Sequence, residues 1–215
     1  FQEVIVTAWE DNLITSPSSQ LWIPAEPEIP ICEGVFDQIL HGDEKVFGGS
    51  VPTALPDGIA GEFAAASLAI AGFFQKIGYQ GRCSFDAIVP AENRGAARVK
   101  FVECNGRWGG TSIPMFLYKR VFGADAKGAK NMAKTYIAAD YTDARLKGSD
   151  FKVLKDILNG YLYNPRTGSG NALLYNAGCL KDFGKFDIIV NGLSRDEVSK
   201  FLNFTMPFLF NRFFS

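Results

Sequence analysis

The sequence contains little of what zinc-binding or nucleic-acid-binding proteins are built from. It has one histidine, His41, and four scattered cysteines without a Cys-x-x-Cys pair, which argues against a zinc site made of Cys and His ligands. Its 22 basic residues are balanced by 23 acidic ones, and no run of five or more basic residues occurs. The charge pattern of a nucleic-acid-binding protein is therefore absent, and no nucleic-acid partner is expected.

Long hydrophobic runs are also missing. The longest helix-like apolar segment, FAAASLAIAGFF, has 12 residues, fewer than the roughly 18 that suggest a membrane span, and is typical of a buried core helix. We expect no membrane partner. The chain opens at Phe1 without a basic segment or signal peptide, and its cysteines are expected to be reduced thiols. These features predict a cytoplasmic protein and the C-terminal part of a longer polypeptide.

What is present is the composition of a globular protein, with 47% hydrophobic and 21% charged residues among 215. Strand-like runs occur at residues 3–9, 20–23, 29–38 and 45–48. From Gly58 to Gly78 apolar residues recur at spacings of three and four, which predicts a helix. The segment 112–141 predicts one or two further helices.

A smaller unit is expected after residue 141. It would contain a helix from Ser149 to Asn159, a strand pair at 172–175 and 186–191, and a last helix that begins at Ser194 with a Ser-x-x-Glu capping box. The aromatic tail, residues 201–215, requires a partner surface, either this chain's own core or a missing N-terminal part.

The stretch GYQGRCSFDAIVPAENRGAARVKFVECNGRWGG contains two strand-like runs, 82–89 and 98–105, joined by a predicted turn at NRGA. With Arg94 and Gly95 at the centre of the turn, Asp86 lies opposite Glu103, and Ser84 lies opposite Asn105. Because strand side chains alternate, one face would carry Asp86, Glu103, Asn105 and Arg107. The other face would be core and comprise Cys83, Phe85, Ala87, Val89, Val102 and Cys104.

Opposed carboxylates repel one another unless a cation lies between them. Asp86, Glu103 and Asn105 offer only oxygen ligands, which suits Mg²⁺ or Mn²⁺. Magnesium held by few protein oxygens usually binds substrate phosphates as well, which indicates a nucleoside triphosphate. Arg107 could then stabilise charge on a transferring phosphoryl group or an oxyanion. An exposed hairpin whose charges form a surface network is the alternative.

These residues resemble a known family. FDAIV followed by FVECNGRWGGTSIP is similar to the magnesium-binding hairpin of the ATP-grasp superfamily, with its Glu-x-Asn-x-Arg signature. SPSSQLWIP, FDQILHGDEKVFGGSVP and TGSGNALLYNAGCLKDFGKFDIIVNG extend the resemblance to the branch that includes the peptide ligase of pheganomycin biosynthesis. The likeness is strong over residues 1–118 and looser over 140–200.

The resemblance implies an α+β fold in which two lobes enclose ATP. Residues 1–140 would form the C-terminal lobe, an antiparallel sheet with helices, and residues 141–215 a small α+β domain. The N-terminal lobe of the same polypeptide would be a partner. The activity implied is ATP- and Mg²⁺-dependent joining of a carboxylate to an amine substrate through an acyl-phosphate. The oligomeric state is left open.

The resemblance also implies roles for individual residues. Asp86, Glu103 and Asn105 would bind the metal, and Arg107 would stabilise the acyl-phosphate and the tetrahedral species formed from it. The backbone of Thr7, Ala8 and Trp9 would lie against adenine, and Gln20 would replace the acid that often binds the ribose. Thr7 and Gln20 both depart from the family's usual acids. The glycine-rich loop and lysines of the N-terminal lobe are not in this sequence.

Several alternatives remain. The chain could be a non-catalytic nucleotide-binding or interaction module that retains the fold, and carboxylation, thioester formation or simple phosphorylation would use the same hairpin. His41 could be a general base or a solvated loop residue, and Asp37 and Gln38 could face substrate or brace the sheet. Serine-nucleophile chemistry is not expected, because Ser16, Ser18 and Ser19 lack a nearby histidine and a Gly-x-Ser-x-Gly motif. TGSG at 167–170 is expected to be a loop.

Overall fold

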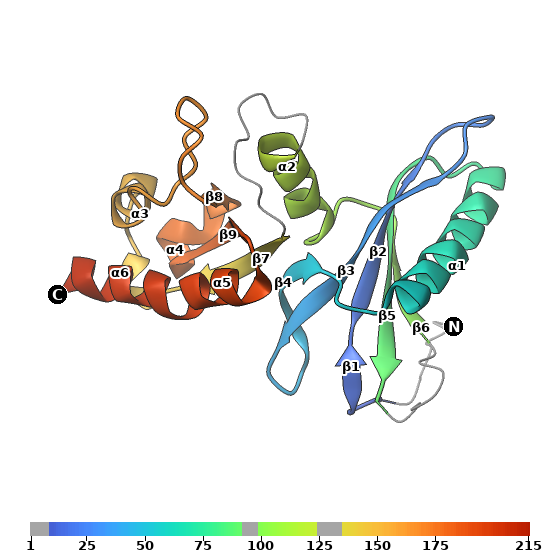
Figure 1. Cartoon of the computed structure of the whole chain (residues 1–215), viewed down its shortest axis with the longest axis horizontal. Coiled ribbons are helices and arrows are strands. Elements are labelled where there is room, and N and C mark those ends of the chain that lie inside the picture. Colours follow the sequence, from blue (N-terminus) through green and yellow to red (C-terminus); the bar gives the residue numbers. More distant parts are fainter. Residues whose placement is uncertain (1–8, 92–98, 124–134) are drawn as a thin grey trace. The chain divides into compact units, whose positions relative to one another are not determined.

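The computed structural model describes residues 9–91, 99–123 and 135–215, which form two compact units (Figure 1). Unit 1 comprises Phe1–Asp37 and Thr53–Arg107, and unit 2 comprises Gln38–Pro52 and Trp108–Ser215. The units are interleaved along the chain, whereas the predicted domains, 1–140 and 141–215, are consecutive; that assignment stays a prediction.

Unit 1 is an antiparallel sheet with one long helix. Its strands are β1 (Leu13–Thr15), β2 (Pro17–Ile23), most of β3 (Ile31–His41), β5 (Gly81–Pro90) and β6 (Lys100–Asn105). β5 is central, because the same residues, Ser84 and Asp86, have partners on both β2 and β6. β1 pairs with the end of β5, and β3 pairs with β2.

The helix α1 (Asp57–Lys76) covers one face of this sheet (Figure 1) and confirms the helix predicted from Gly58. Phe63, Ser67 and Ala71, spaced four apart, are its buried stripe. The helix predicted to be a buried core helix is buried along this stripe only, since the opposite side is exposed, including Phe73. Among the described helices, α1 alone meets the length and composition criteria for a membrane span, although the stripe at Phe63 packs on the sheet.

Unit 2 combines an antiparallel sheet in the order β4-β7-β9-β8 with short helices. Its strands are β4 (Val46–Pro52), β7 (Thr135–Thr142), β8 (Ala172–Tyr175) and β9 (Lys185–Gly192). Its helices are α2 (Ser112–Phe122), α3 (Phe151–Ile157), α4 (Leu180–Phe183), α5 (Arg195–Lys200) and α6 (Met206–Phe214), with 3-10 turns at Ala144–Leu146 and Ala177–Cys179 and a π-helical turn at Phe201–Thr205.

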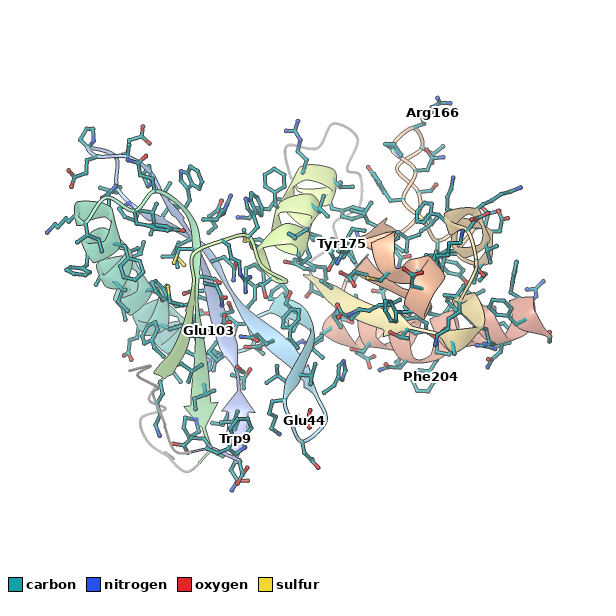
Figure 2. All side chains as sticks on the ribbon, turned by 180° about the vertical axis from the view of Figure 1, so that it is seen from behind. Trp9, Glu44, Glu103, Arg166, Tyr175 and Phe204 are labelled. Carbon is teal, nitrogen blue, oxygen red and sulfur yellow. The ribbon has the colours of Figure 1, made fainter. Side chains whose placement is uncertain are left out.

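The C-terminal tail packs on this chain's own core. Phe210 of α6 is fully buried, and its ring lies 5.3 Å from that of Tyr141 and 6.2 Å from that of Phe186. For Phe210, the prediction that the aromatic tail packs on this chain's own core is thereby confirmed. Phe204, labelled in Figure 2, is 70% exposed and does not take part in this core.

One sequence-based assignment in unit 2 is wrong. Residues 135–141 are predicted to be helical but belong to β7, because this segment pairs along its whole length with β9 and this pairing outweighs the helix propensity of its alanines. The helix predicted from a Ser149 cap to Asn159 is present as α3, with Asp150 rather than Ser149 at its N-cap.

Other assignments agree with the structure. The strand pair β8–β9 forms as predicted. The Ser194 hydroxyl accepts from the Glu197 N–H at 3.2 Å, and the Glu197 carboxylate accepts from the Leu193 N–H at 2.8 Å, one residue before the expected partner. The predicted strand at 3–9, apart from Trp9, and the turn at 93–96 lie outside the described residues.

One face of the unit 2 sheet carries two neighbouring carboxylates beside buried apolar residues such as Ile189. Asp140 of β7 lies directly opposite Asp187 of β9. Lys185 Nζ donates to Asp140 Oδ2 at 2.7 Å, and Asn176 Nδ2 donates to Asp187 Oδ2 at 2.7 Å. Asp187 Oδ1 is buried without a hydrogen-bond partner among the described residues. Burial, aided by Asp140, raises the pKa of Asp187 to about 6.

This raised pKa predicts a pH-dependent loss of stability. The folded state binds the Asp187 proton more tightly than the unfolded state, so the contribution to stability is present below the ordinary carboxyl pKa and is lost as pH rises through about 6. Thermal unfolding of Asp187→Asn at about pH 4 and about pH 8 should show a smaller fall in Tm than wild type. Asp182→Asn, at an exposed carboxyl of α4, is the control; parallel behaviour of wild type and Asp187→Asn would contradict the assignment.

Candidate functional site

Three adjacent strands of unit 1 bring six polar side chains onto one face of the sheet. Opposed residues of antiparallel strands share a face, as do residues two apart. One row crosses β2, β5 and β6 as Ser18, Asp86 and Glu103; the next crosses them as Gln20, Ser84 and Asn105. We refer to these six residues as the polar array.

The register predicted for the hairpin is confirmed. Asp86 pairs with Glu103, and Ser84 pairs with Asn105. The structure therefore brings together all three predicted metal ligands. Figure 2 labels Glu103, which is exposed on the edge strand β6, whereas Asp86 is half-buried on the central strand.

The predicted core face is right for β5 and wrong for β6. Cys83, Phe85, Ala87 and Val89 are buried as expected, but Val102 is 58% exposed and Cys104 is also exposed. A bulge explains Val102: Ala87 pairs with Phe101, so Val102 is an extra residue on β6. Phe101, which is 39% exposed, packs toward the core instead, with its ring centre 5.2 Å from that of Phe63 and 5.9 Å from that of Phe85. Cys104 pairs with Phe85 and so keeps the predicted face, but it is exposed on this edge strand.

Hydrogen bonds from both neighbouring strands orient the Asp86 carboxylate. Ser18 Oγ donates to Oδ1 at 2.5 Å, and Asn105 Nδ2 donates to Oδ2 at 3.2 Å. Gln20 Nε2 in turn donates to Ser18 Oγ at 2.8 Å. Since Ser18 and Gln20 are almost fully buried, they form a rigid support behind Asp86.

The array has the donor chemistry of a hard-cation site. Its three predicted ligands, Asp86, Glu103 and Asn105, are two carboxylates and one amide. No cluster of three or more His, Cys, Asp or Glu side chains that could bind a metal occurs among residues 9–91, 99–123 and 135–215. Two carboxylates are typical of Mg²⁺, which completes its octahedron with water and substrate phosphates. Because Asn105 uses its amide nitrogen toward Asp86, its oxygen is the atom that could bind a cation. The residues present therefore fit Mg²⁺ or Mn²⁺.

The remaining predicted site residues lie outside the array or have other contacts. Arg107 is exposed in the turn two residues beyond β6, so strand alternation does not determine its direction. Thr7 and Ala8 lie outside the described residues, and Trp9 is 65% exposed and belongs to no strand. Gln20 bonds to Ser18, and its ribose contact stays a prediction.

Sequence reasoning missed the role of Ser18, which it weighed only as a nucleophile. The sequence carries only a partial signal: Ser16, Ser18 and Gln20 alternate with Pro17, Leu21 and Ile23 as in a strand with one polar face, but Ser19 and Trp22 break the pattern.

The sequence allows two roles for Asp37, contact with a substrate or support of the sheet. In the structure, Asp37 supports the chain through hydrogen bonds to residues 53 and 54. Its Oδ1 accepts from the Thr53 hydroxyl at 2.8 Å and its Oδ2 accepts from the Ala54 N–H at 2.9 Å, which holds the segment leading into α1.

His41 is exposed at the end of β3. Its ring packs against Gly48, where any Cβ atom would clash with the ring. The TGSG segment is a turn, closed by a bridge between Asn164 and Ser169, as predicted.

No protein-family model and no curated protein sequence matches the chain. Solved structures do match its fold. N5-carboxyaminoimidazole ribonucleotide synthetase in an ADP complex matches with a TM-score of 0.59 and 10% identity, over 95% of this chain and 51% of that one. Carboxyaminoimidazole ribonucleotide synthase from Aspergillus clavatus, complexed with ATP, matches with a TM-score of 0.57 and 9% identity, over 94% and 51%.

Biotin carboxylase from Campylobacter jejuni, in a β,γ-ATP complex, matches with a TM-score of 0.57 and 15% identity, over 88% of this chain and 44% of that one. The chain thus spans about half the length of the structures that it matches. The predicted α+β class, an antiparallel sheet with helices, is confirmed, while the pheganomycin branch stays a prediction. The antiparallel sheet with helices and the matches to these structures together show that the chain has the fold of the ATP-grasp superfamily.

Proposed function

We propose that this chain is part of an ATP- and Mg²⁺-dependent ligase that joins a carboxylate to an amine. The observation that carries the proposal is the polar array, in which Asp86 of β5 and Glu103 and Asn105 of β6 share one face of two paired strands. The fold supports it, because several matched structures were solved with ATP or ADP.

Asp86, Glu103 and Asn105 would hold Mg²⁺ or Mn²⁺. The bound ion would supply charge neutralisation for the phosphates of ATP. Ser18 and Gln20 would keep the Asp86 carboxylate in one orientation before the ion arrives, so that less side-chain freedom is lost on binding.

In this reaction ATP phosphorylates the substrate carboxylate, the amine attacks the resulting acyl-phosphate, and phosphate leaves as the amide forms. Such chemistry depends mainly on positioning and charge stabilisation. Arg107 would stabilise the acyl-phosphate and the tetrahedral species, and Thr7 to Trp9 with Gln20 would contact the nucleoside. The N-terminal lobe of the polypeptide would supply the remaining phosphate contacts.

Glu103→Gln tests the metal assignment, because it keeps the size of the side chain and removes its charge. In the full-length protein, isothermal titration should give a Mg²⁺-dependent ATP affinity at least about tenfold weaker than wild type, equivalent to about 1.4 kcal/mol. ATP binding without Mg²⁺ should be unaffected. Glu62→Gln, at an exposed carboxyl of α1, is the control, and an unchanged affinity in Glu103→Gln would refute the assignment.

Ser18→Ala tests the support of Asp86 against a closely matched variant, Ser16→Ala. Both serines are buried and donate one hydrogen bond, Ser18 to Asp86 and Ser16 to the Ala87 carbonyl, so each variant should lose about 1 kcal/mol of stability. Only Ser18→Ala should also weaken Mg²⁺-dependent ATP binding, by several-fold, and Ser18→Thr should restore it. Equal affinities in the two alanine variants would show that Ser18 matters for stability alone.

A non-catalytic nucleotide-binding module is the second candidate. It is favoured by Gln20, which stands where the family often has an acid and bonds to Ser18. Phosphate release by the full-length protein, measured with ATP and a panel of carboxylates and amines, separates the two: release that requires both substrates supports the ligase, and nucleotide binding without release supports the module.

A further inference from the structure

We infer that Cys83 of β5 and Cys104 of β6 form a reversible disulfide directly behind the polar array. Their Sγ atoms lie 3.8 Å apart. Neither residue has a role in the proposed reaction. The disulfide does not depend on the proposed function; only its effect on metal and nucleotide binding rests on that function.

The two sulfurs are in contact but not yet at bonding distance. Cys104 pairs with Phe85, so Cys83 is its diagonal neighbour rather than its direct partner. An S–S bond of about 2.05 Å requires the two sulfurs to approach one another. In the proposed disulfide β6 would supply this movement, because its described pairings are with β5 alone and its residues are mostly exposed. The bond would be reversible because a reductant can reach the exposed sulfur of Cys104.

The two sulfurs differ in access. Cys104 is exposed, so an external oxidant reaches it first. Cys83 is only 2% exposed and belongs to the cluster with Phe85 beneath α1. Tyr79 lies beside both sulfurs, and burial together with the two cysteines raises its pKa. Each oxidant molecule therefore meets one reactive thiol with a second thiol in contact behind it.

The chemistry balances with a low-molecular-weight disulfide such as oxidised glutathione. The Cys104 thiolate attacks one sulfur of the oxidant, forming a mixed disulfide and releasing one glutathione, which takes up the proton lost by Cys104. Cys83 Sγ then attacks Cys104 Sγ, and the second glutathione leaves with the Cys83 proton. Two cysteines are oxidised and one glutathione disulfide is reduced to two thiols. Because burial raises the pKa of Cys83 to about 12, the second step should accelerate as pH rises.

The position of Cys104 links this bond to the array. Cys104 lies between Glu103 and Asn105 on β6, with its side chain on the opposite face. Drawing its sulfur toward Cys83 shifts the backbone that carries both neighbours, and with it the 3.2 Å bond from Asn105 to Asp86. Oxidation would therefore change the geometry of the proposed metal ligands although the disulfide lies on the opposite face of the sheet.

Tryptic digestion gives a direct test, because the cysteines fall on separate peptides, CSFDAIVPAENR and FVECNGR. The full-length protein is incubated with oxidised glutathione at about pH 8, quenched with acid, and digested without reductant. We expect these two peptides to be linked in monomeric protein, with the mass of two hydrogen atoms lost and restored by dithiothreitol. Cys83→Ser and Cys104→Ser should abolish the link, and Cys179→Ser, at another exposed cysteine, should leave it intact.

The disulfide is overturned if glutathione stays on Cys104 without the linked peptides, or if the link forms only between two chains or after unfolding. Titration with Mg²⁺-ATP then tests the effect on the array: oxidised wild type should differ several-fold in Kd from reduced wild type, and oxidised Cys104→Ser should not. Equal Kd values in both states would overturn the coupling. A reduced protein that binds no Mg²⁺-ATP would overturn the proposed function and leave the disulfide standing.

Discussion

The candidate site depends on one constraint, the position of β5 between β2 and β6. Cys83 and Phe85 of β5 are buried in a cluster with Ala71 of α1, while Ser84 and Asp86 point to the other face. A slip of one residue would place Asp86 in an apolar core and Phe85 in solvent, at a cost of several kcal/mol. The same hydrophobic packing that stabilises unit 1 therefore aligns the carboxylates.

Polar groups in the two units illustrate opposite uses of burial. In unit 1, the buried side chains of Ser18 and Gln20 donate in sequence toward Asp86, so that their desolvation is offset by hydrogen bonds and the carboxylate is oriented. In unit 2, Asp187 is buried opposite a second carboxylate and one of its oxygens has no partner among the described residues. The oriented carboxylate of Asp86 suits cation binding. The buried carboxylate of Asp187 is expected to make the free energy of unfolding depend on pH.

The edge strand β6 combines two properties that rarely occur on a core strand. Its residues are mostly exposed, and its register contains a bulge. It also carries two of the three proposed metal ligands, with Cys104 between them. In the proposed disulfide, this placement would couple thiol chemistry on one face of β6 to oxygen ligands on the other, while Cys83 and Phe85 of β5 remain packed under α1.

Local patterns in the sequence determined much of this fold. The periodic apolar residues of α1, the capping box at Ser194 and the opposition of Asp86 to Glu103 follow from neighbouring residues and a short connection. The tertiary structure alone decided that Ser18 lies beside Asp86, 68 residues away, that Phe101 rather than Val102 packs toward Phe63 and Phe85, and that residues 135–142 pair with β9. These features depend on pairing between distant segments, whose energy is not encoded in any local stretch of side chains.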